Sequence, residues 1–223
     1  MEKQRTIHVK GTGTASVPPD YVVLTMELSA ENTDYAHAMR IGAQQLDMLR
    51  EAIEEAGFSA DELKTTNFSV DAKYENEEYE EGNRTKYRRV FIGYKCEHTL
   101  KLSFDMDNER LTKAISAIGD SLSKPEISIA FTVKDKQKVK DIVLQSAAED
   151  ARRKADILCK ASGVELSDLV RIEYSWNELH IEHSLDVAVM ADCCPTGAGG
   201  ADYDFRPNDI EAGDTVDFLW EIR

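Results

Sequence analysis

The chain has 223 residues, of which 42% are apolar, so it can bury a sizeable core without disulfides or a metal. Its 27 Lys and Arg against 42 Asp and Glu give a formal net charge of −15, which argues against binding to nucleic acid or to anionic membranes. No apolar run is long enough to cross a membrane, and residues 1–6 do not begin an export signal. We therefore expect a cytoplasmic protein with no membrane insertion.

Alternation of apolar and polar residues along the chain predicts strands. The alternation is clearest in the first strand, where Ile7, Val9, Ala15 and Val17 share one face and Pro18 ends the pattern. Seven strands are expected in all, at about residues 6–17, 22–30, 66–74, 90–104, 127–133, 170–176 and 216–222.

A spacing of three and four residues predicts three helices between these strands. The first follows a Thr33/Asp34 cap and ends before Gly57, the second follows Asp105 or Asp107, and the third spans about 136–162 and is closed by Gly163. The expected inward residues are Met39, Ala43, Leu46, Leu49, Ile53 and Ala56; Leu111, Ile115, Ile118 and Leu122; and Val139, Val143, Ala147, Ala151, Ala155 and Leu158. The alanines of the third helix indicate a close approach to a sheet or another helix.

The order ββαββαβαββ predicts an α+β fold, with seven strands in a mainly antiparallel or mixed sheet and three helices packed on it. We expect one domain over residues 1–223, which could be two interwoven subdomains. Residues 178–212 hold eight carboxylates against one Arg206 and fit no regular pattern. They are expected to form an irregular acidic loop, either mobile or ligand-binding. Gly11 and Gly13 lead into more strand, so they favour a bulge or a close crossing over a phosphate loop.

The acidic and then basic segment around residues 75–89 predicts that strands three and four form a long projecting hairpin at about 64–104. Both strands place even-numbered residues inward, which favours a three-residue turn at residues 81–83. That register pairs Tyr74 with Val90 and Val70 with Tyr94. It also predicts exposed ion pairs between Glu80 and Arg84, Glu78 and Lys86, and Glu75 and Arg89.

Residue clusters that could carry chemistry are few. His180, His183, Cys193 and Cys194 could together bind zinc, but their spacing is unlike a zinc motif, and solvated loop residues are the better interpretation. The four cysteines, including Cys96 and Cys159, are expected to be reduced thiols. His98 follows the inward pattern and is expected in a core or an interface. We therefore assign no catalytic residue, cofactor or metal site.

Five motifs in order resemble the SIMPL-domain family, which includes bacterial periplasmic immunogenic proteins and a eukaryotic kinase-associated signalling protein. Residues 11–20, GTGTASVPPD, are similar to the family's opening G-x-G-x-x-x-V-x-P-D. The other matches are the Lys-Thr strand within 62–70, the Gly-Tyr strand within 92–100, the alanine-rich helix 147–158 with Gly163, and the closing strand 213–222. The resemblance implies an α+β protein of bacterial type, non-enzymatic, often self-associating, and linked to stress responses or to signalling through partners.

The leading hypothesis is a non-enzymatic, self-associating scaffold or interaction protein that forms a homo-oligomer and could also bind a protein partner. Tyr74, Val90 and Tyr94 are the expected contact residues between copies, because they share the inner face of the predicted hairpin. The alternative is a small-molecule or metal binder that uses the 178–212 loop. A hydrolase or redox enzyme has the least support.

Overall fold

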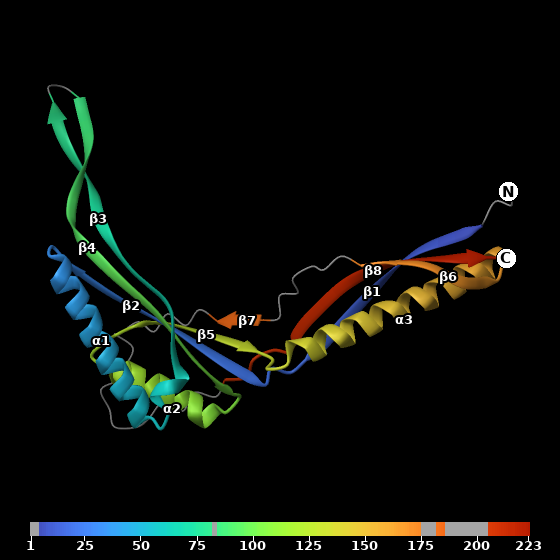
Figure 1. Cartoon of the computed structure of the whole chain (residues 1–223), viewed down its shortest axis with the longest axis horizontal. Helices are drawn as coiled ribbons and strands as arrows, with labels where there is room; N and C mark the ends of the chain where they lie inside the picture. Colours follow the sequence, from blue (N-terminus) through green and yellow to red (C-terminus); the bar gives the residue numbers. More distant parts are fainter. Residues whose placement is uncertain (1–4, 82–83, 175–181, 186–204) are drawn as a thin grey trace. The chain divides into compact units, whose positions relative to one another are not determined.

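The structure is a computed structural model that describes residues 5–81, 84–174, 182–185 and 205–223. The chain divides into two compact units that interleave along the sequence. Unit 1 consists of residues 1–20, 131–183 and 207–223, and unit 2 of residues 21–130 and 184–206. Each unit is built around its own sheet (Figure 1).

Unit 1 contains a three-stranded sheet in the order β1-β8-β6. The first strand, β1 (Thr6–Val17), pairs antiparallel along its whole length with β8 (Ile210–Ile222), which pairs antiparallel with β6 (Leu166–Glu173) on its other side. Odd residues of β1 and even residues of β8 face a core that includes Val9, Val216, Phe218 and Trp220. The rings of Phe218 and Trp220 stack at 5.2 Å and complete this core.

The helix of unit 1, α3 (Lys136–Ser162), lies unusually close to β1. A Cβ at Gly11 would come within 2.0 Å of the Ala147 carbonyl oxygen, and one at Gly13 within 1.9 Å of the Val143 carbonyl oxygen. Alanines 147, 151 and 155 are fully buried against the sheet. The predicted close crossing of glycine strand and alanine helix is therefore confirmed, as is the stop at Gly163, which has φ +68°.

The same helix also covers the open edge of β1. The backbone N–H of Thr12 donates to Asp150 Oδ2 at 2.9 Å, that of Thr14 donates to Ser146 Oγ at 3.4 Å, and Lys154 Nζ donates to the Lys10 carbonyl at 3.2 Å. These donors and acceptors on α3 are spaced four residues apart and therefore follow one face of the helix. They satisfy edge groups that would otherwise be open to strand pairing.

A five-stranded sheet in the order β3-β4-β2-β5-β7 belongs mostly to unit 2. The two longest strands, β3 (Leu63–Glu81) and β4 (Arg84–Asp105), pair antiparallel, and β2 (Tyr21–Asn32) pairs antiparallel with the lower part of β4. The sheet is extended by β5 (Glu126–Thr132) and β7 (Glu182–Leu185). Its core includes Leu24, Met26, Leu100 and Leu102, all fully buried.

Two helices belong to unit 2. The first, α1 (Tyr35–Glu55), begins at the Asp34 cap and packs on β2 and β4, and a short helix, η1 (Ala60–Glu62), precedes β3. The second, α2 (Asn108–Asp120), begins at the Asp107 cap and packs beside α1. Gly42 is buried because α1 lies closest to the sheet there: a Cβ would come within 2.9 Å of Cys96 Sγ.

The α+β class and the order of the predicted elements are confirmed. Several details differ. The inward face of α1 begins with Ala38 and Gly42, not Met39 and Ala43, since the smallest side chains occupy the closest approach. The buried residue near the end of α3 is Cys159, while Leu158 is half exposed.

The strand boundaries differ most near the C-terminus. The predicted irregular stretch 178–212 contains β7 and the first residues of β8, which starts at Ile210. The sixth strand starts at Leu166, earlier than expected, and its predicted inward residues Val170 and Ile172 are exposed because α3 lies mainly over β1 and β8. Trp176 and most of the acidic loop lie outside the described residues.

Candidate interaction surface on the arm

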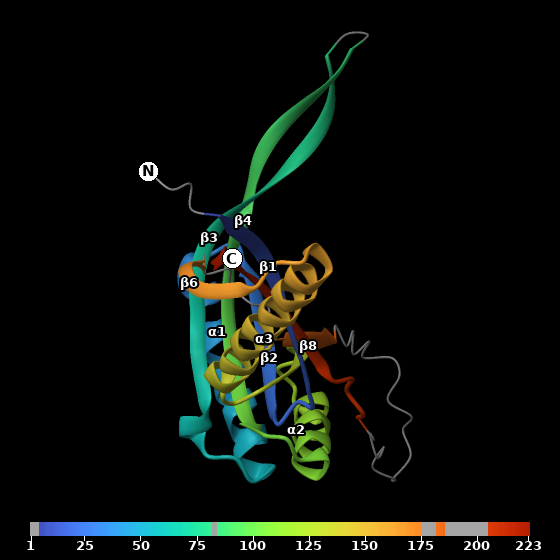
Figure 2. The ribbon, with the colours of Figure 1, turned by 90° about the vertical axis from the view of Figure 1, so that its right-hand side faces the viewer.

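The upper parts of β3 and β4 extend beyond the rest of their sheet. The last pair between β2 and β4 joins Asn32 to Tyr94. Above it, residues 73–81 and 84–93 pair only with each other in the described structure, and we call these residues the arm. Figures 1 and 2 show the two strands twisting around each other as they leave the sheet. The predicted projecting hairpin is therefore present.

A β-bulge marks the base of the arm. Lys73 pairs with Gly93, but Tyr74 pairs with Phe91, so Ile92 is the extra residue on β4. Gly93 has φ +148°, and a Cβ there would come within 2.6 Å of the Asn32 carbonyl oxygen. Only glycine allows this approach of β4 to the end of β2. The bulge increases the local twist and changes which residues of β4 share a face with β3.

The predicted three-residue turn at 81–83 is wrong. Glu81 pairs with Arg84, which leaves two residues between the paired strands. The parity argument assumed an uninterrupted ladder, and the bulge at Ile92 supplies the one-residue shift that this argument lacked. Val90 therefore pairs with Glu75, on the face of the arm opposite to the face of Tyr74 and Phe91.

The face with Tyr74 carries a chain of aromatic contacts. The rings of Tyr74 and Phe91 are 5.7 Å apart, those of Phe91 and Tyr94 5.2 Å, and those of Tyr94 and Tyr35 5.3 Å, all edge to face. Edge-to-face packing is favourable for aromatic rings at these separations. We call Tyr35, Tyr74, Phe91 and Tyr94 the aromatic surface. The exposed fractions are 49% for Tyr35, 45% for Tyr74 and 44% for Phe91.

The start of α1 positions Tyr35 at the lower end of this surface. The Asp34 backbone N–H donates to Asn32 Oδ1 at 2.9 Å, and Asp34 Oδ1 accepts from the backbone N–H of His37 at 2.9 Å. Hydrogen bonds from the side chain and backbone of His37 lower the pKa of Asp34, so this carboxylate is ionised. Its negative charge stabilises the N-terminus of α1. These bonds fix the first turn of α1 against Tyr94.

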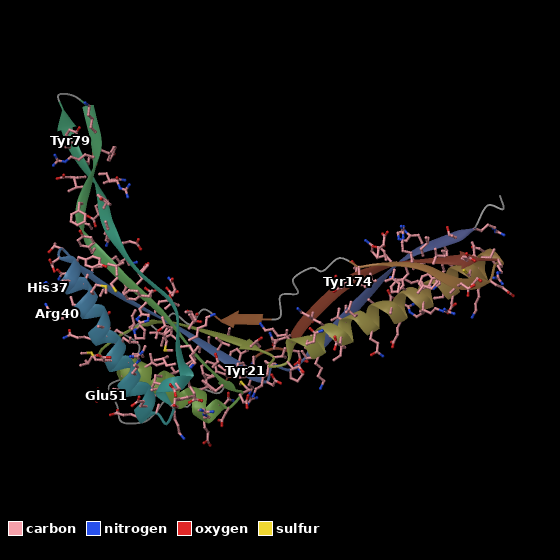
Figure 3. All side chains as sticks on the ribbon, in the orientation of Figure 1. Tyr21, His37, Arg40, Glu51, Tyr79 and Tyr174 are labelled. Atoms are coloured by element: carbon pink, nitrogen blue, oxygen red, sulfur yellow. The ribbon has the colours of Figure 1, made fainter. Side chains whose placement is uncertain are left out.

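Charged residues complete the arm. The Arg89 guanidinium lies 4.5 Å from the centre of the Tyr74 ring, at the upper end of the aromatic surface. On the opposite face, Arg88 pairs with Glu77 at 2.6 Å and lies 5.6 Å from the ring of Tyr79, which Figure 3 labels toward the far end of the arm. An ion pair across the arm is therefore present, and it joins Glu77 to Arg88, which were not among the predicted pairs.

Other predicted residues lie in the cores. Cys96 and Cys159 are free, buried thiols, and burial raises the pKa of Cys96. His98 is buried in unit 2, where its Nε2 lies 2.9 Å from Thr65 Oγ1, and burial followed by the charge of Arg50 lowers its pKa. These environments fit structural side chains.

The side chains of the predicted metal-binding residues lie outside the part of the chain that the structure describes. His180, Cys193 and Cys194 lie outside the described residues, as does the side chain of His183 in β7. In the described part of the chain, no cluster of three or more His, Cys, Asp or Glu could hold a metal ion. None of the described helices is long and apolar enough to span a bilayer.

Sequence reasoning missed two members of the aromatic surface, Tyr35 and Phe91. Phe91 falls on the outward parity of an uninterrupted strand, and Tyr35 precedes the apolar repeat of its helix. The one local signal for Phe91 is Gly93, since an isolated glycine within a strand often marks a bulge.

A profile of the SIMPL family, described as a protein of unknown function (DUF541), matches residues 7–220. This match covers nearly the whole chain, so the protein belongs to the SIMPL family. A search of curated proteins finds no match.

Proposed function

We propose that this SIMPL protein is a self-associating scaffold and that the aromatic surface of the arm is the contact between its copies. One observation carries the proposal: a continuous chain of aromatic rings runs from Tyr35 at the start of α1, past Tyr94, to Phe91 and Tyr74 on the projecting strands, and three of these rings are about half exposed. Exposed apolar surface of this kind marks interaction sites, and aromatic residues with arginine dominate the centres of protein interfaces.

The composition of the arm suits contact with an identical arm. Residues 75–89 carry five acidic and four basic side chains, so they are nearly neutral in a chain with a net charge of −15. Two identical arms would therefore repel each other less than other surfaces of the chain. In a two-fold contact, Arg89 of one copy would approach the tyrosines of the other, while the Glu77–Arg88 face would stay in solvent.

The proposed role is binding and not catalysis. The residues that distinguish the arm are aromatic rings and ion pairs, which suit recognition of a protein surface. A role in stress responses or in signalling through further protein partners follows from the family resemblance and is part of the proposal.

Native mass spectrometry and light scattering on the purified 223-residue chain test self-association. We expect one defined oligomer at micromolar concentration, which dissociates on dilution. A strictly monomeric species over the same concentration range would contradict the proposal.

A further inference from the structure

A second surface of unit 2 has features that the arm does not explain. The C-terminal half of α1 and one face of α2 line an open groove of about 900 Å³. Its apolar lining includes Ala52 and Ala56 from α1 and Ala117 from α2, with Met48 and Leu122 beside them. Small side chains along two neighbouring helices leave room for another segment to approach their backbones.

Leu122 is held in solvent at one end of this groove. Its exposed fraction is 80%, the largest among the exposed large apolar side chains of the described residues. The flanking Ser121 and Ser123 are both buried, and their hydroxyl oxygens lie 2.7 Å apart. Lys124 follows with φ +45°. Because the two serines are fixed inward, the leucine between them is fixed outward, although burial of its side chain would be favourable.

The groove is also acidic. Glu51, which Figure 3 labels on α1, lines it together with Glu55 and Asp120, against the single base Lys113. In the described part of the chain, none of these three carboxylates forms an ion pair. Neither helix has a basic residue in its last turn, where the helix dipole favours a cation. Positive charge from a binding partner would therefore be favoured here.

We propose that this groove is a docking site for an amphipathic α-helix of another protein, with a narrow apolar stripe flanked by Lys and Arg. Helices bind in this way through apolar residues spaced at i, i+3, i+4 and i+7. The alanines of the groove admit the stripe, Leu122 and Met48 pack against its end, and the carboxylates bind the flanking cations. This site is separate from the arm, so it adds a partner to the proposed scaffold.

The probe is a synthetic, fluorescently labelled helical peptide with Leu and Ala at these stripe positions and Lys elsewhere. Its counterpart has Glu in place of Lys. Anisotropy titrations of both against the full chain measure affinity. We expect the Lys peptide to bind and the Glu peptide to bind at least about tenfold more weakly. Equal binding of the two peptides would overturn the proposal.

Matched variants then locate the binding. Leu122→Ser should weaken binding of the Lys peptide by about tenfold, the loss expected for part of one buried leucine. Ile157→Ser, at another exposed apolar residue, on α3, should not. Glu55→Gln should weaken it more than Glu54→Gln, because Glu54 does not line the groove. Phe91→Ser, on the arm, should leave the peptide affinity unchanged.

The outcomes are distinct. If Leu122→Ser and Ile157→Ser have equal effects, the peptide binds by general charge attraction and the proposal fails. If Leu122→Ser instead dissociates a homo-oligomer without affecting the peptide, the occupant is a second copy and the proposal also fails. Because these substituted side chains are exposed, the substitutions should leave the fold intact.

Discussion

At the residue scale, Asp150 shows how one carboxylate connects a helix to a strand edge. It accepts from Lys154 Nζ at 2.6 Å, from the Thr12 backbone N–H at 2.9 Å and from Arg153 at 2.5 Å. The hydrogen bond from Lys154, followed by that from Thr12, lowers the pKa of Asp150 from 3.8 to about 2. The ionised form is therefore part of what closes the edge of β1.

Because the pKa of Asp150 is lower in the folded state, its ionisation stabilises the fold above pH 3.8, and this contribution is lost as the pH falls from about 4 to about 2. A carbon NMR titration should give a pKa of about 2 for Asp150. Lys154→Met should raise that value toward 3.8. An unshifted carboxyl in the unmodified chain would contradict the contact.

Residue positions could be predicted from the sequence where a regular pattern continued. The inward parity of β4 correctly places Cys96, His98, Leu100 and Leu102 in the core of unit 2. The same parity fails above Gly93, because a bulge depends on how β4 meets Asn32 of another strand. Leu122 was expected to be inward for a related reason: the α2 repeat continues through it in sequence, but the helix ends at Asp120.

At the scale of elements, the crossing of α3 over β1 depends on the absence of side chains. Gly11→Ala would place a Cβ against the helix backbone, so we expect overpacking to destabilise unit 1 by about 1–3 kcal/mol or more. Gly119 lies within α2 with no atom near its would-be Cβ. Gly119→Ala should therefore stabilise the protein by about 0.5–1 kcal/mol, the usual gain in a helix.

Urea unfolding followed by circular dichroism measures both changes. Opposite signs for the two Gly→Ala substitutions are expected, with unchanged secondary structure in the folded baseline. If Gly11→Ala were as well tolerated as Gly119→Ala, α3 would not lie against β1 as closely as described.

The helices and most strands could be predicted because their signals are local: a cap such as Asp107, an apolar period, and a stop such as Gly163. The extension of β3 and β4 into the arm was foreseen from the charge pattern. The sequence did not predict that β6 starts at residue 166 or that β8 starts at residue 210. Those boundaries are set by pairing partners that are distant in sequence.

At the scale of the whole molecule, the sequence predicted one domain, with two interwoven subdomains as a possibility. The chain forms two compact units whose segments alternate along the sequence, each with its own sheet. Strands far apart in sequence, such as β1 and β8, complete a unit together. No local pattern specifies such pairing, which is why the sequence could not determine how the predicted strands divide between two sheets.

The proposed assembly depends on a single residue, because the bulge at Ile92 determines which side chains lie on each face of the arm. Val90 and Phe91 are neighbours in sequence but lie on opposite faces of the arm. Regular alternation predicted Val90 on the contact face and Phe91 on the opposite face, whereas the structure places Phe91 with Tyr74 and Val90 on the other side. Substituting each by serine therefore separates the corrected register from the predicted one.

Sedimentation velocity of the unmodified 223-residue chain and of its Phe91→Ser and Val90→Ser variants tests the central claim most directly. We expect the unmodified chain to associate, Phe91→Ser to weaken association by about tenfold or more, as loss of a buried aromatic ring implies, and Val90→Ser to retain it. Circular dichroism should show that both variants stay folded. Equal effects of the two substitutions, or no association of the unmodified chain, would contradict an interface made by the aromatic surface.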